Sequence, residues 1–316
     1  MLSIKFKMNA ICLFFITIAL SAIAMIAIPG CAERKESTGN TNTAPFNNGA
    51  TPKLISKQFS FTEGPAVDKD GNVFFTDQPN NKIWKYGTDG RLTVFLDKAG
   101  RSNGMYFDKK GNLVTCADEQ NQLWSIDPKG KVTVLLQHYK GKRFNGPNDL
   151  WIHPGGGIYF TDPYYQRDYW TRTVPDLKEE NVYYLAPNAK EPVEVAGNFK
   201  RPNGIIGTPN GKTLYVADIN ANKTFRYSIN EDGSLSEPTL FVEKGSDGMT
   251  IDNKGNVYIT GNGVTIYNPA GKQIGHIPIA ESWTANVCFA GKKRDKLFIT
   301  ASPSVYIMDM NVQGVK

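Results

Sequence analysis

Six oxygen-bearing side chains recur along this chain at similar intervals, and together they could bind a hard cation. Successive members lie 40, 45, 55, 44 and 39 residues apart. The set is Glu63, Asn103, Asn148, Asn203, Asp247 and Asn286. Two carboxylates and four carboxamides, without imidazole or thiolate, make the donor set that Ca²⁺ prefers, with about 6–8 oxygens at roughly 2.3–2.6 Å. The pattern therefore predicts a divalent-cation site, provided that the fold gathers these residues.

A repeated pair of strands must position each of these side chains. The pattern is clearest in Asn148–Asp162 (NDLWIHPGGGIYFTD), where an alternating apolar run, a Gly-centred turn and a second apolar run follow the polar residue. A repeat of about 40–45 residues with several strands per repeat is typical of a β-propeller. First strands line the central channel of a propeller and begin at one mouth. The six polar residues are therefore expected to converge at that mouth.

The two ends of the chain predict how the ring closes. Thr51–Phe61 has the pattern of a lone strand before the first repeat, and Ser304–Met310 that of a third strand with no fourth strand after it. An N-terminal strand that completes the sixth blade would remove two open sheet edges. We therefore predict an all-β, six-bladed β-propeller over residues 53–316, closed by its N-terminal strand.

Turn formation is a simpler explanation for some of the polar positions, because Asn and Asp before Gly are common turn residues. It accounts for Asn103, Asn203 or Asp247 individually as well as a cation site does. Turn formation accounts poorly for Glu63. It is also a weaker explanation for Asn148, because the next residue is Asp149 and not a glycine. The aspartates at the ends of second strands are expected to be structural. They are Asp77, Asp118, Asp162 and Asp218.

Hydrolytic chemistry at such a site would rely on the cation and a carboxylate. None of the three His occupies one of the six positions, and no G-x-S-x-G, phosphate-loop or dinucleotide motif is present, which disfavours a His-based nucleophile relay and nucleotide chemistry. A cation would polarise a carbonyl or phosphoryl oxygen while a carboxylate activates water. Asp247 is the first candidate for this base and Asp149 the second. Arg143 could hold a substrate hydroxyl or carboxylate, although a surface salt bridge is the commoner fate of a single Arg.

The longest spacing contains an insertion, Tyr164–Asn181, between the second and third strands of the third repeat. That connection lies on the same face as the start of the first strand, so the insertion should overhang the mouth near Asn148. Its aromatic residues suit either a pocket wall or lid, or a loop that packs on itself. They are Tyr164, Tyr165, Tyr169 and Trp170.

The N-terminus carries a targeting signal. Lys5 and Lys7 precede an uncharged apolar run, Ala10–Ile28, that ends in Pro-Gly before Cys31, which resembles a bacterial lipoprotein signal. We predict that residues 1–30 are a signal peptide and that Cys31 is lipidated, so that the membrane holds the protein outside the cytoplasm, in the periplasm or at the cell surface. The alternative is an uncleaved membrane anchor. Residues 31–52, rich in Ser, Thr, Asn, Gly and Pro, predict a flexible tether.

The net charge and the positions of the cysteines bear on nucleic-acid binding and on disulfide formation. The formal charge of +6 over 316 residues is mild, and no basic tract with interleaved aromatics is present, so nucleic acid is not an expected partner. Cys116 and Cys288 lie in repeats that are not neighbours in a six-membered ring. We therefore expect both side chains to be small buried thiols and not to form a disulfide.

Several motifs resemble those of the family of senescence marker protein, gluconolactonase and luciferin-regenerating enzyme. They are FTEGP with Glu63, RFNGPNDL with Asn148, GGIYFTDP, RPNGI with Asn203 and GSDGMTID with Asp247. The resemblance extends from Phe61 to Thr300 and implies a six-bladed propeller with one divalent ion on its axis.

The resemblance also implies residue roles. The family's metal triad falls on Glu63, Asn203 and Asp247, Asn148 contributes directly or through water, and Asp247 is the acid/base. Its Arg and Asn substrate contacts match Arg143 and Asn148, with Gly146 and Pro147 as two extra residues between them. A third contact, a Glu, has no counterpart and would fall near Gln166. Asn103, Asp149 and Asn286 complete the candidate substrate contacts.

The resulting hypothesis is a metal-dependent hydrolase that opens a sugar lactone such as gluconolactone. Ca²⁺ is the expected ion, with Zn²⁺, Mg²⁺ and Mn²⁺ as alternatives. The related fold of diisopropylfluorophosphatase keeps phosphoester or aryl-ester hydrolysis as a variant. A non-catalytic, sugar-binding surface propeller is the alternative from another class. The presence of both Glu63 and Asp247 favours the enzyme, since the fold alone does not fix function.

Overall fold

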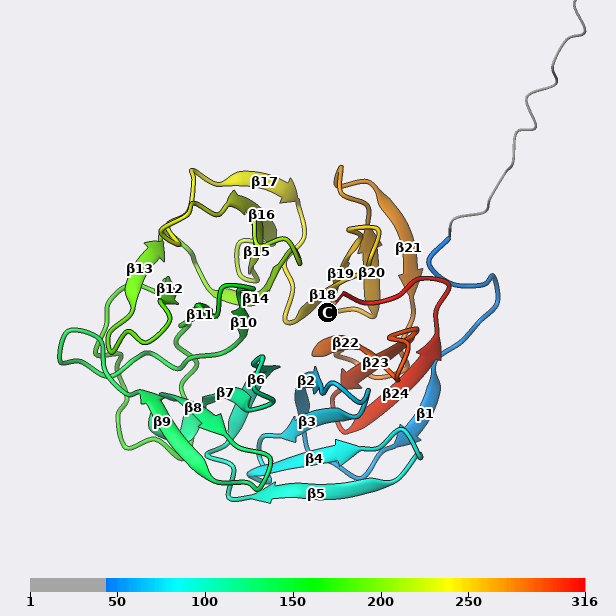
Figure 1. Cartoon of the computed structure of the whole chain (residues 1–316), viewed down its shortest axis with the longest axis horizontal. Coiled ribbons are helices and arrows are strands. Elements are labelled where there is room, and N and C mark those ends of the chain that lie inside the picture. The colour runs from blue at the N-terminus through cyan, green and yellow to red at the C-terminus, as the bar shows by residue number, and fades with distance from the viewer. Residues whose placement is uncertain (1–43, 316) are drawn as a thin grey trace, which may run out of the picture. The chain divides into compact units, whose positions relative to one another are not determined.

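The computed structural model describes residues 44–315, and they form six four-stranded antiparallel sheets around a central axis (Figure 1). The predicted six-bladed propeller is confirmed. The innermost strand of each blade belongs to the polar repeats, and no α-helix occurs among residues 44–315. The predicted signal peptide and the lipidation site at Cys31 lie outside the described residues. Within the described part of the chain, no helix is long and apolar enough to span a bilayer.

Each of the first three blades contains four consecutive strands. Blade one comprises β2 (Thr62–Val67), β3 (Val73–Asp77), β4 (Lys82–Tyr86) and β5 (Leu92–Asp97). Blade two comprises β6 (Ser102–Phe107), β7 (Leu113–Ala117), β8 (Gln122–Ile126) and β9 (Val132–Leu136), with the 3-10 turn η1 (Asp118–Gln120) after β7. Blade three comprises β10 (Leu150–Ile152), β11 (Ile158–Thr161), β12 (Val182–Leu185) and β13 (Val193–Ala196).

The other three blades repeat this order, except that the last takes one strand from the N-terminal side. Blade four comprises β14 (Pro202–Gly207), β15 (Thr213–Asp218), β16 (Lys223–Ser228) and β17 (Thr239–Val242). Blade five comprises β18 (Met249–Ile251), β19 (Val257–Ile259), β20 (Val264–Tyr267) and β21 (Gln273–Ile277). Blade six comprises β22 (Asn286–Ala290), β23 (Lys296–Ala301), β24 (Ser304–Asp309) and β1 (Lys53–Ser56).

Strand β1 closes the ring, as predicted. It pairs antiparallel with β24, with Lys53 opposite Ile307 and Leu54 opposite Tyr306. Part of the predicted tether also packs here, because Pro45 accepts a hydrogen bond from the Asn311 backbone N–H (2.8 Å). First and last segments of the described chain therefore share one blade.

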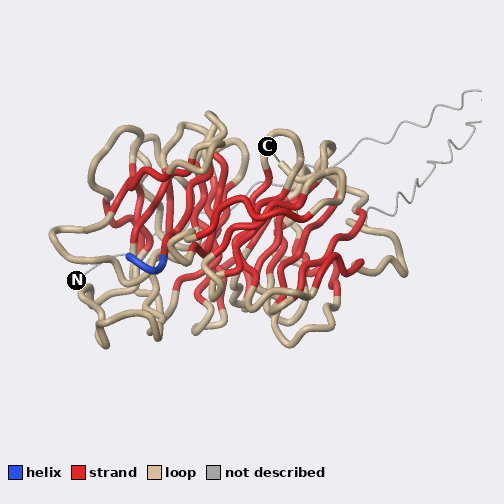
Figure 2. The backbone as a smooth tube through the Cα atoms, turned by 90° about the horizontal axis from the view of Figure 1, so that it is seen from below, coloured by secondary structure: helices blue, strands red, loops and turns tan. Residues whose placement is uncertain are grey.

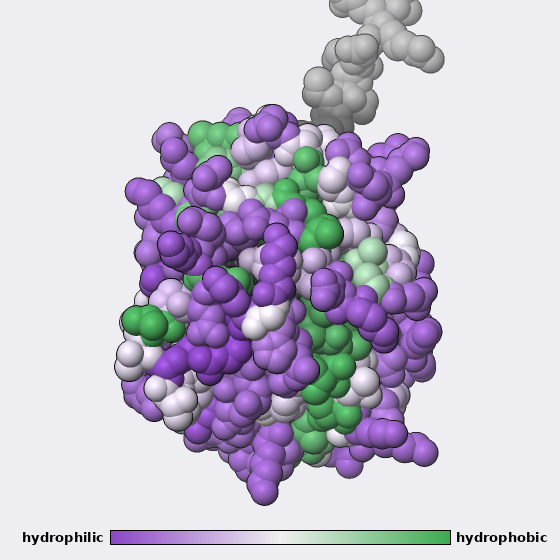
Figure 3. Space-filling model, turned by 90° about the vertical axis from the view of Figure 1, so that its left-hand side faces the viewer, coloured by the Kyte–Doolittle hydropathy of each residue, from purple (hydrophilic) through white to green (hydrophobic). Residues whose placement is uncertain are grey.

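The core lies between the blades. All residues of the second strands β3 and β7 are buried, whereas fourth strands such as β5 alternate between half-buried and exposed residues. Fully buried rings such as Phe75 and Phe298 pack against each other at 5.5 Å between centroids, and each contributes about 1.5–3 kcal/mol of burial free energy. Large exposed hydrophobic side chains include one on the outermost strand of every blade, and Figure 3 shows such apolar strips on a mainly hydrophilic rim.

The strands run between two faces on which all the loops lie (Figure 2). One face carries η1 and the starts of the first strands. The opposite face carries the Gly-centred turns, and there the C-terminal tail pairs with blades five and six. The Gly314 N–H donates to the Arg294 carbonyl (2.8 Å), and the Asn253 N–H donates to the Gln313 carbonyl (2.7 Å).

Candidate active site

A cavity of about 470 Å³ opens at the mouth where the first strands begin. Five of the six repeated polar residues line it, so the predicted convergence is found. They are Glu63, Asn103, Asn148, Asn203 and Asp247. Side chains from loops complete the lining. These are Phe61, Gln78, Tyr165, Arg167, Ile219, Asn220 and Trp283.

Glycines that follow the polar positions let the first strands approach closely. A Cβ on Gly64 would lie 2.0 Å from the Asn103 carbonyl oxygen, and one on Gly104 would lie 2.6 Å from the Cα of Asp149. The Gly104 N–H also donates to the Asn148 carbonyl across the blade boundary (2.8 Å). These glycines therefore serve strand packing at the axis, which the turn explanation of the repeat did not include.

Glu63 and Asp247 are buried carboxylates at the floor of the cavity. The Gly64 N–H and the Asn286 side-chain amide donate to Glu63 Oε2 at 2.6 and 3.1 Å. Burial, and next the charge of Asp247, raise the pKa of Glu63 well above its usual range. Burial raises the pKa of Asp247 to about 6. Two buried carboxylates that line one cavity need either protons or a counter-cation.

The Trp283 indole fixes the orientation of Asp247. Its Nε1–H donates to Asp247 Oδ2 at 2.6 Å, and this bond opposes the rise in the pKa of Asp247. The side chain of Trp283 is 37% exposed and lines the cavity. Trp283 lies outside the repeated pattern, which therefore does not indicate its role.

The carboxamides present unsatisfied oxygens, which fits a bound cation. Asn103 Oδ1 and Asn203 Oδ1 are buried and have no hydrogen-bond partner among residues 44–315, although buried polar atoms are normally paired. The Asn203 amide nitrogen donates to the Tyr165 hydroxyl at 3.1 Å, which leaves the oxygen free for another partner. No group of three or more His, Cys, Asp or Glu side chains in the described residues is arranged to hold a metal ion by itself. A cation here would therefore rely on amide oxygens beside the two carboxylates.

Asn286 and Asp149 lie beneath this floor. Both line a second, smaller cavity of about 40 Å³ farther along the axis. Asp149 Oδ1 accepts the Leu150 N–H (2.9 Å), and burial raises the pKa of Asp149 to about 7. The Asn286 amide reaches up to Glu63. These two predicted contacts therefore support the floor from below and do not line the larger cavity.

Arg143 is not brought to the cavity. Its guanidinium pairs with Asp176 through Nε–Oδ2 at 3.1 Å and Nη2–Oδ1 at 3.3 Å, and 44% of the side chain is exposed. The structure thus shows the surface salt bridge that a single Arg commonly makes.

The insertion Tyr164–Asn181 forms a wall of the cavity and joins β11 to β12, as predicted. Tyr165 and Arg167 line the cavity. The rest is anchored to blades two and three, where the Trp170 Nε1–H donates to the Asp118 carbonyl (3.0 Å) and Arg172 donates to the Asn145 carbonyl. Both interpretations of the insertion therefore hold in part, because Tyr165 and Arg167 near its start line the cavity while Trp170 packs on the protein.

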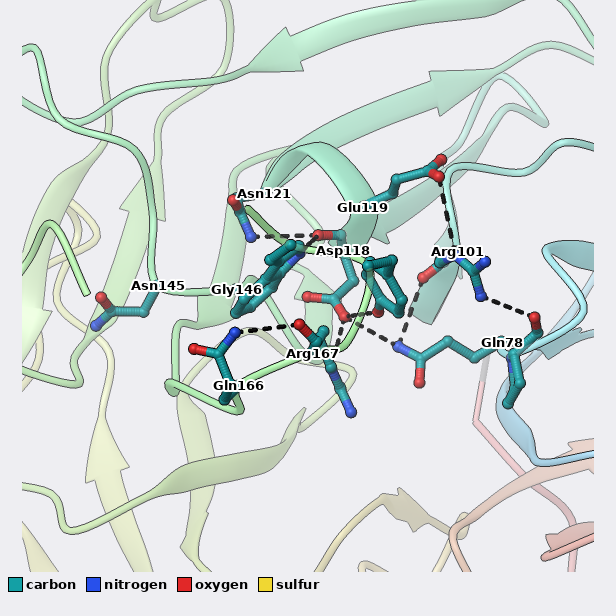
Figure 4. Close-up of polar contacts among 12 residues, drawn as sticks. Gln78, Arg101, Asp118, Glu119, Asn121, Asn145, Gly146, Gln166 and Arg167 are labelled. Carbon is teal, nitrogen blue, oxygen red and sulfur yellow. Dashed lines mark hydrogen bonds and ion pairs between the residues drawn. The ribbon is translucent and has the colours of Figure 1, made fainter. Parts of the chain in front are cut away.

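Three of the four aspartates at second-strand ends have the expected structural role. Asp77 accepts the backbone N–H groups of Ser60 and Phe61, and Asp162 and Asp218 each accept two in the same way. Asp118 differs, since its Oδ2 accepts only side-chain donors, which come from Gln78, Arg167 and Tyr169 (Figure 4).

Comparisons with known proteins match almost the whole propeller. A model of the SMP-30/gluconolactonase/LRE-like region matches residues 61–303. A gluconolactonase of Zymomonas mobilis is 30% identical, and the alignment covers 90% of this chain and 94% of that protein. A solved gluconolactonase of Xanthomonas campestris superposes with a TM-score of 0.79 at 27% identity, covering 86% of this chain and 92% of that one. A calcium-binding regucalcin of Agrobacterium tumefaciens shares the fold at 18% identity, with a TM-score of 0.70 and coverage of 84% and 96%.

Proposed function

Since this chain belongs to the SMP-30/gluconolactonase/LRE-like family, we propose that it is a metal-dependent lactonase that opens a sugar lactone such as gluconolactone. The near full-length similarity to a gluconolactonase supports lactone hydrolysis. One observation carries the assignment of the site. Two buried carboxylates and two buried, unpartnered amide oxygens face the axial cavity.

The residues that would hold the cation are Glu63, Asn148, Asn203 and Asp247, and the free Oδ1 of Asn103 lies in the same cavity. Oxygen ligands of this kind suit Ca²⁺, and also Mg²⁺ or Mn²⁺. When bound, a divalent ion polarises the carbonyl oxygen of the lactone and offsets negative charge that develops there.

The side chains supply the rest of the chemistry. The carboxylate of Asp247 is the base that accepts a proton from the attacking water, and it returns this proton to the ring oxygen as the acyl C–O bond breaks. Trp283 holds Oδ2 of this carboxylate through its hydrogen bond. An ionised carboxylate has about four lone-pair sites, so Asp247 can contact the cation and still accept the proton while Trp283 holds Oδ2. Asn103 and Asn148 line the cavity and can hold lactone hydroxyl groups.

The direct test measures proton release from D-glucono-1,5-lactone, above the spontaneous rate, by a chain lacking residues 1–30 with Cys31→Ser. Activity should disappear after chelation and return when Ca²⁺, Mg²⁺, Mn²⁺ or Zn²⁺ is added. Asp247→Asn should lower kcat by at least about 10²-fold, since general acid–base catalysis contributes about 10²–10⁴-fold. Asp232→Asn, in an exposed turn, is the matched control.

Two results would count against this function. Activity that survives thorough chelation would contradict metal dependence. A chain that binds a metal stoichiometrically but opens no lactone would move the assignment to another ester or to a sugar-binding propeller.

We also propose that the protein is anchored outside the cytoplasm by a lipid on Cys31, on the basis of its leader sequence. Wild-type protein expressed in a Gram-negative host should fractionate with membranes and incorporate labelled palmitate. Cys31→Ser should lose the label. Equal labelling of both chains would contradict lipidation at this residue.

A further inference from the structure

Arg167 is the only cationic residue among the described residues that line the larger cavity. It comes from the insertion between β11 and β12, for which no other blade has an equivalent. Its side chain is 25% exposed, so it is mostly buried yet open to the cavity. A guanidinium in this position either fastens the wall or binds something that enters the cavity.

The structure shows what holds Arg167 in place. Its Nε–H donates to Asp118 Oδ2 at 2.8 Å, and the side chain of Asp118 is only 3% exposed. Gln78 and Tyr169 donate to the same carboxylate oxygen. Figure 4 shows these donors gathered around Asp118, with the far end of the guanidinium beyond them. This arrangement fixes one edge of Arg167 and leaves the other edge unused.

The other blades show that Asp118 accepts a hydrogen bond from Arg167 in place of the backbone N–H groups that equivalent aspartates accept. Equivalent aspartates, such as Asp162, bind two backbone N–H groups that precede the first strand of their own blade. In blade two the Arg101 N–H donates instead to the side chain of Asn81 at 2.7 Å. Asn81 therefore frees the Asp118 carboxylate for the insertion.

The terminal nitrogens Nη1 and Nη2 of Arg167 make no hydrogen bond to any residue in the range 44–315. Neither nitrogen is among the buried donors that lack a partner in the described residues, so both are open to the cavity, where a ligand could accept hydrogen bonds from them. Two parallel N–H groups at this end of a guanidinium match a carboxylate or a phosphate. The free edge therefore has the geometry of an anion contact.

The neighbouring wall holds a second guanidinium group, that of Arg201, which is paired with Glu180 at 3.7 Å. Arg167 and Arg201 lie 5.5 and 4.6 Å from the centroid of the Tyr165 ring. Carboxylates stand at the axial floor, where a cation would neutralise them. The wall is thus the side of the cavity that favours a negatively charged group.

We propose that Arg167 binds an anionic substituent of the lactone, a carboxylate or a phosphate remote from the reacting carbonyl. The proposal rests on the proposed function and narrows its substrate class to acidic sugar lactones. The carboxylate of Asp118 positions the guanidinium, and the free edge of Arg167 makes the contact.

Binding tests the proposal without any need for hydrolysis. Calcium-loaded protein is titrated calorimetrically with D-glucuronate, D-glucose 6-phosphate and D-glucose. The first two carry the candidate anions and the third is the neutral ring. At least one acid should bind about tenfold or more tightly than glucose, because a hydrogen bond to a charged group is worth about 1.5–3 kcal/mol. Whichever acid is preferred identifies the anion.

Three variants assign the preference to Arg167. Arg167→Gln should abolish it, and Arg167→Lys should keep part of it because the charge remains without the fork. Arg143→Gln is the matched control, since Arg143 lies in a surface ion pair away from the cavity. Equal affinity for glucose and both acids in the wild type, or a preference that survives Arg167→Gln, would overturn the proposal.

Kinetics separates this inference from the proposed function. In Arg167→Gln, kcat/KM should fall at least about tenfold for D-glucaro-1,4-lactone or 6-phospho-D-glucono-1,5-lactone. The value for neutral D-glucono-1,5-lactone should stay within about threefold. An equal fall for all three lactones would assign Arg167 to fastening the wall. Preserved acid binding without hydrolysis of any lactone would reject the lactonase and leave the anion site standing.

Discussion

Glu63 and Asp247 bury negative charge at the axis, and the protein tolerates this arrangement because a cation or a proton can compensate it. Burial raises the pKa of both carboxyl groups. The site is therefore strained electrostatically when it is empty and deprotonated. This property distinguishes a binding site from a set of structural turn residues.

The metal-free protein should become more stable as the pH falls towards 5. The pKa of Asp247 is about 6 in the folded state against an ordinary value of 3.8, so its contribution is fully present below about 3.8 and is lost as the pH rises through 6. Scanning calorimetry with a chelator should give a higher Tm at pH 5 than at pH 7.5.

Two further measurements check the origin of this pH dependence. Asp247→Asn should flatten it, and Ca²⁺ should raise the Tm more at pH 7.5 than at pH 5, since the cation competes with protons for the carboxylates. A metal-free Tm that rises steadily from pH 5 to pH 7.5 would contradict the prediction.

Trp283→Phe should impair turnover while leaving the fold intact. The change removes the hydrogen bond to Asp247 Oδ2, which favours the charged carboxylate. The acid limb of the kcat/KM profile should therefore move to higher pH, by about one unit or less, and kcat should fall about tenfold. Trp84→Phe is the matched control, because the Trp84 Nε1 has no hydrogen-bond partner in the described part of the protein. An unchanged pH profile in Trp283→Phe would remove the indole from the mechanism.

Individual residues also show where sequence reasoning succeeded and failed. The axial set was predictable because the repeat fixes both the residue type and the place of each member in its blade. The roles of Arg167 and Trp283 were not predictable, because Arg167 lies in an insertion that the other blades lack and Trp283 lies in a connection between blades, outside the repeated pattern. Arg143 has a suitable residue type, but its side chain pairs with Asp176 at the surface.

At the scale of strands, packing at the axis depends on residues without a side chain. Gly64, Gly104, Gly204 and Gly248 each follow a polar axial position, and a Cβ on any of them would lie under 3.0 Å from the neighbouring blade. The sequence shows the glycines but not their role, because the neighbour that each one contacts is 38 to 45 residues away along the chain.

Gly104→Ala should separate blades two and three at the mouth. Its Cβ would lie 2.6 Å from the Asp149 Cα, and overpacking of this kind costs about 1–3 kcal/mol. Denaturant unfolding should show this loss, and calcium affinity should fall with it because Asn103 and Asn148 are displaced. Gly87→Ala is the matched control, since the atom nearest to its Cβ belongs to the exposed side chain of Asp89. Unchanged stability and affinity in Gly104→Ala would show that the strands can move apart freely.

At the scale of the whole molecule, the closure of the ring could be deduced from the two incomplete ends of the repeat. The lone N-terminal strand and the three-stranded last blade complement each other, which the pairing of β1 with β24 confirms. Strand β1 is shorter than the predicted Thr51–Phe61, since regular pairing covers only Lys53–Ser56. Sequence patterning marks apolar alternation and does not reveal where hydrogen bonding to a distant strand stops.

Removal of β1 should destabilise the entire propeller. A chain that starts at Gln58 leaves β24 as an open edge, so we expect a Tm lower by more than about 5 °C, the shift that roughly 2 kcal/mol causes in a protein of this size. Size-exclusion chromatography should also detect association through the free edge. A chain that starts at Thr51 keeps β1 and is the control. Equal Tm values for the two truncated chains would show that ring closure contributes little.

The pairing of β1 with β24 also sets the order of events during synthesis. Strand β1 leaves the ribosome before every other strand of the propeller, and its partner β24 emerges about 250 residues later. Blades one to five can each form from neighbouring segments as they appear, but the sixth cannot. A nascent chain therefore holds an unpaired strand until β24 has been synthesised, and this strand is the segment that a chaperone would have to shield.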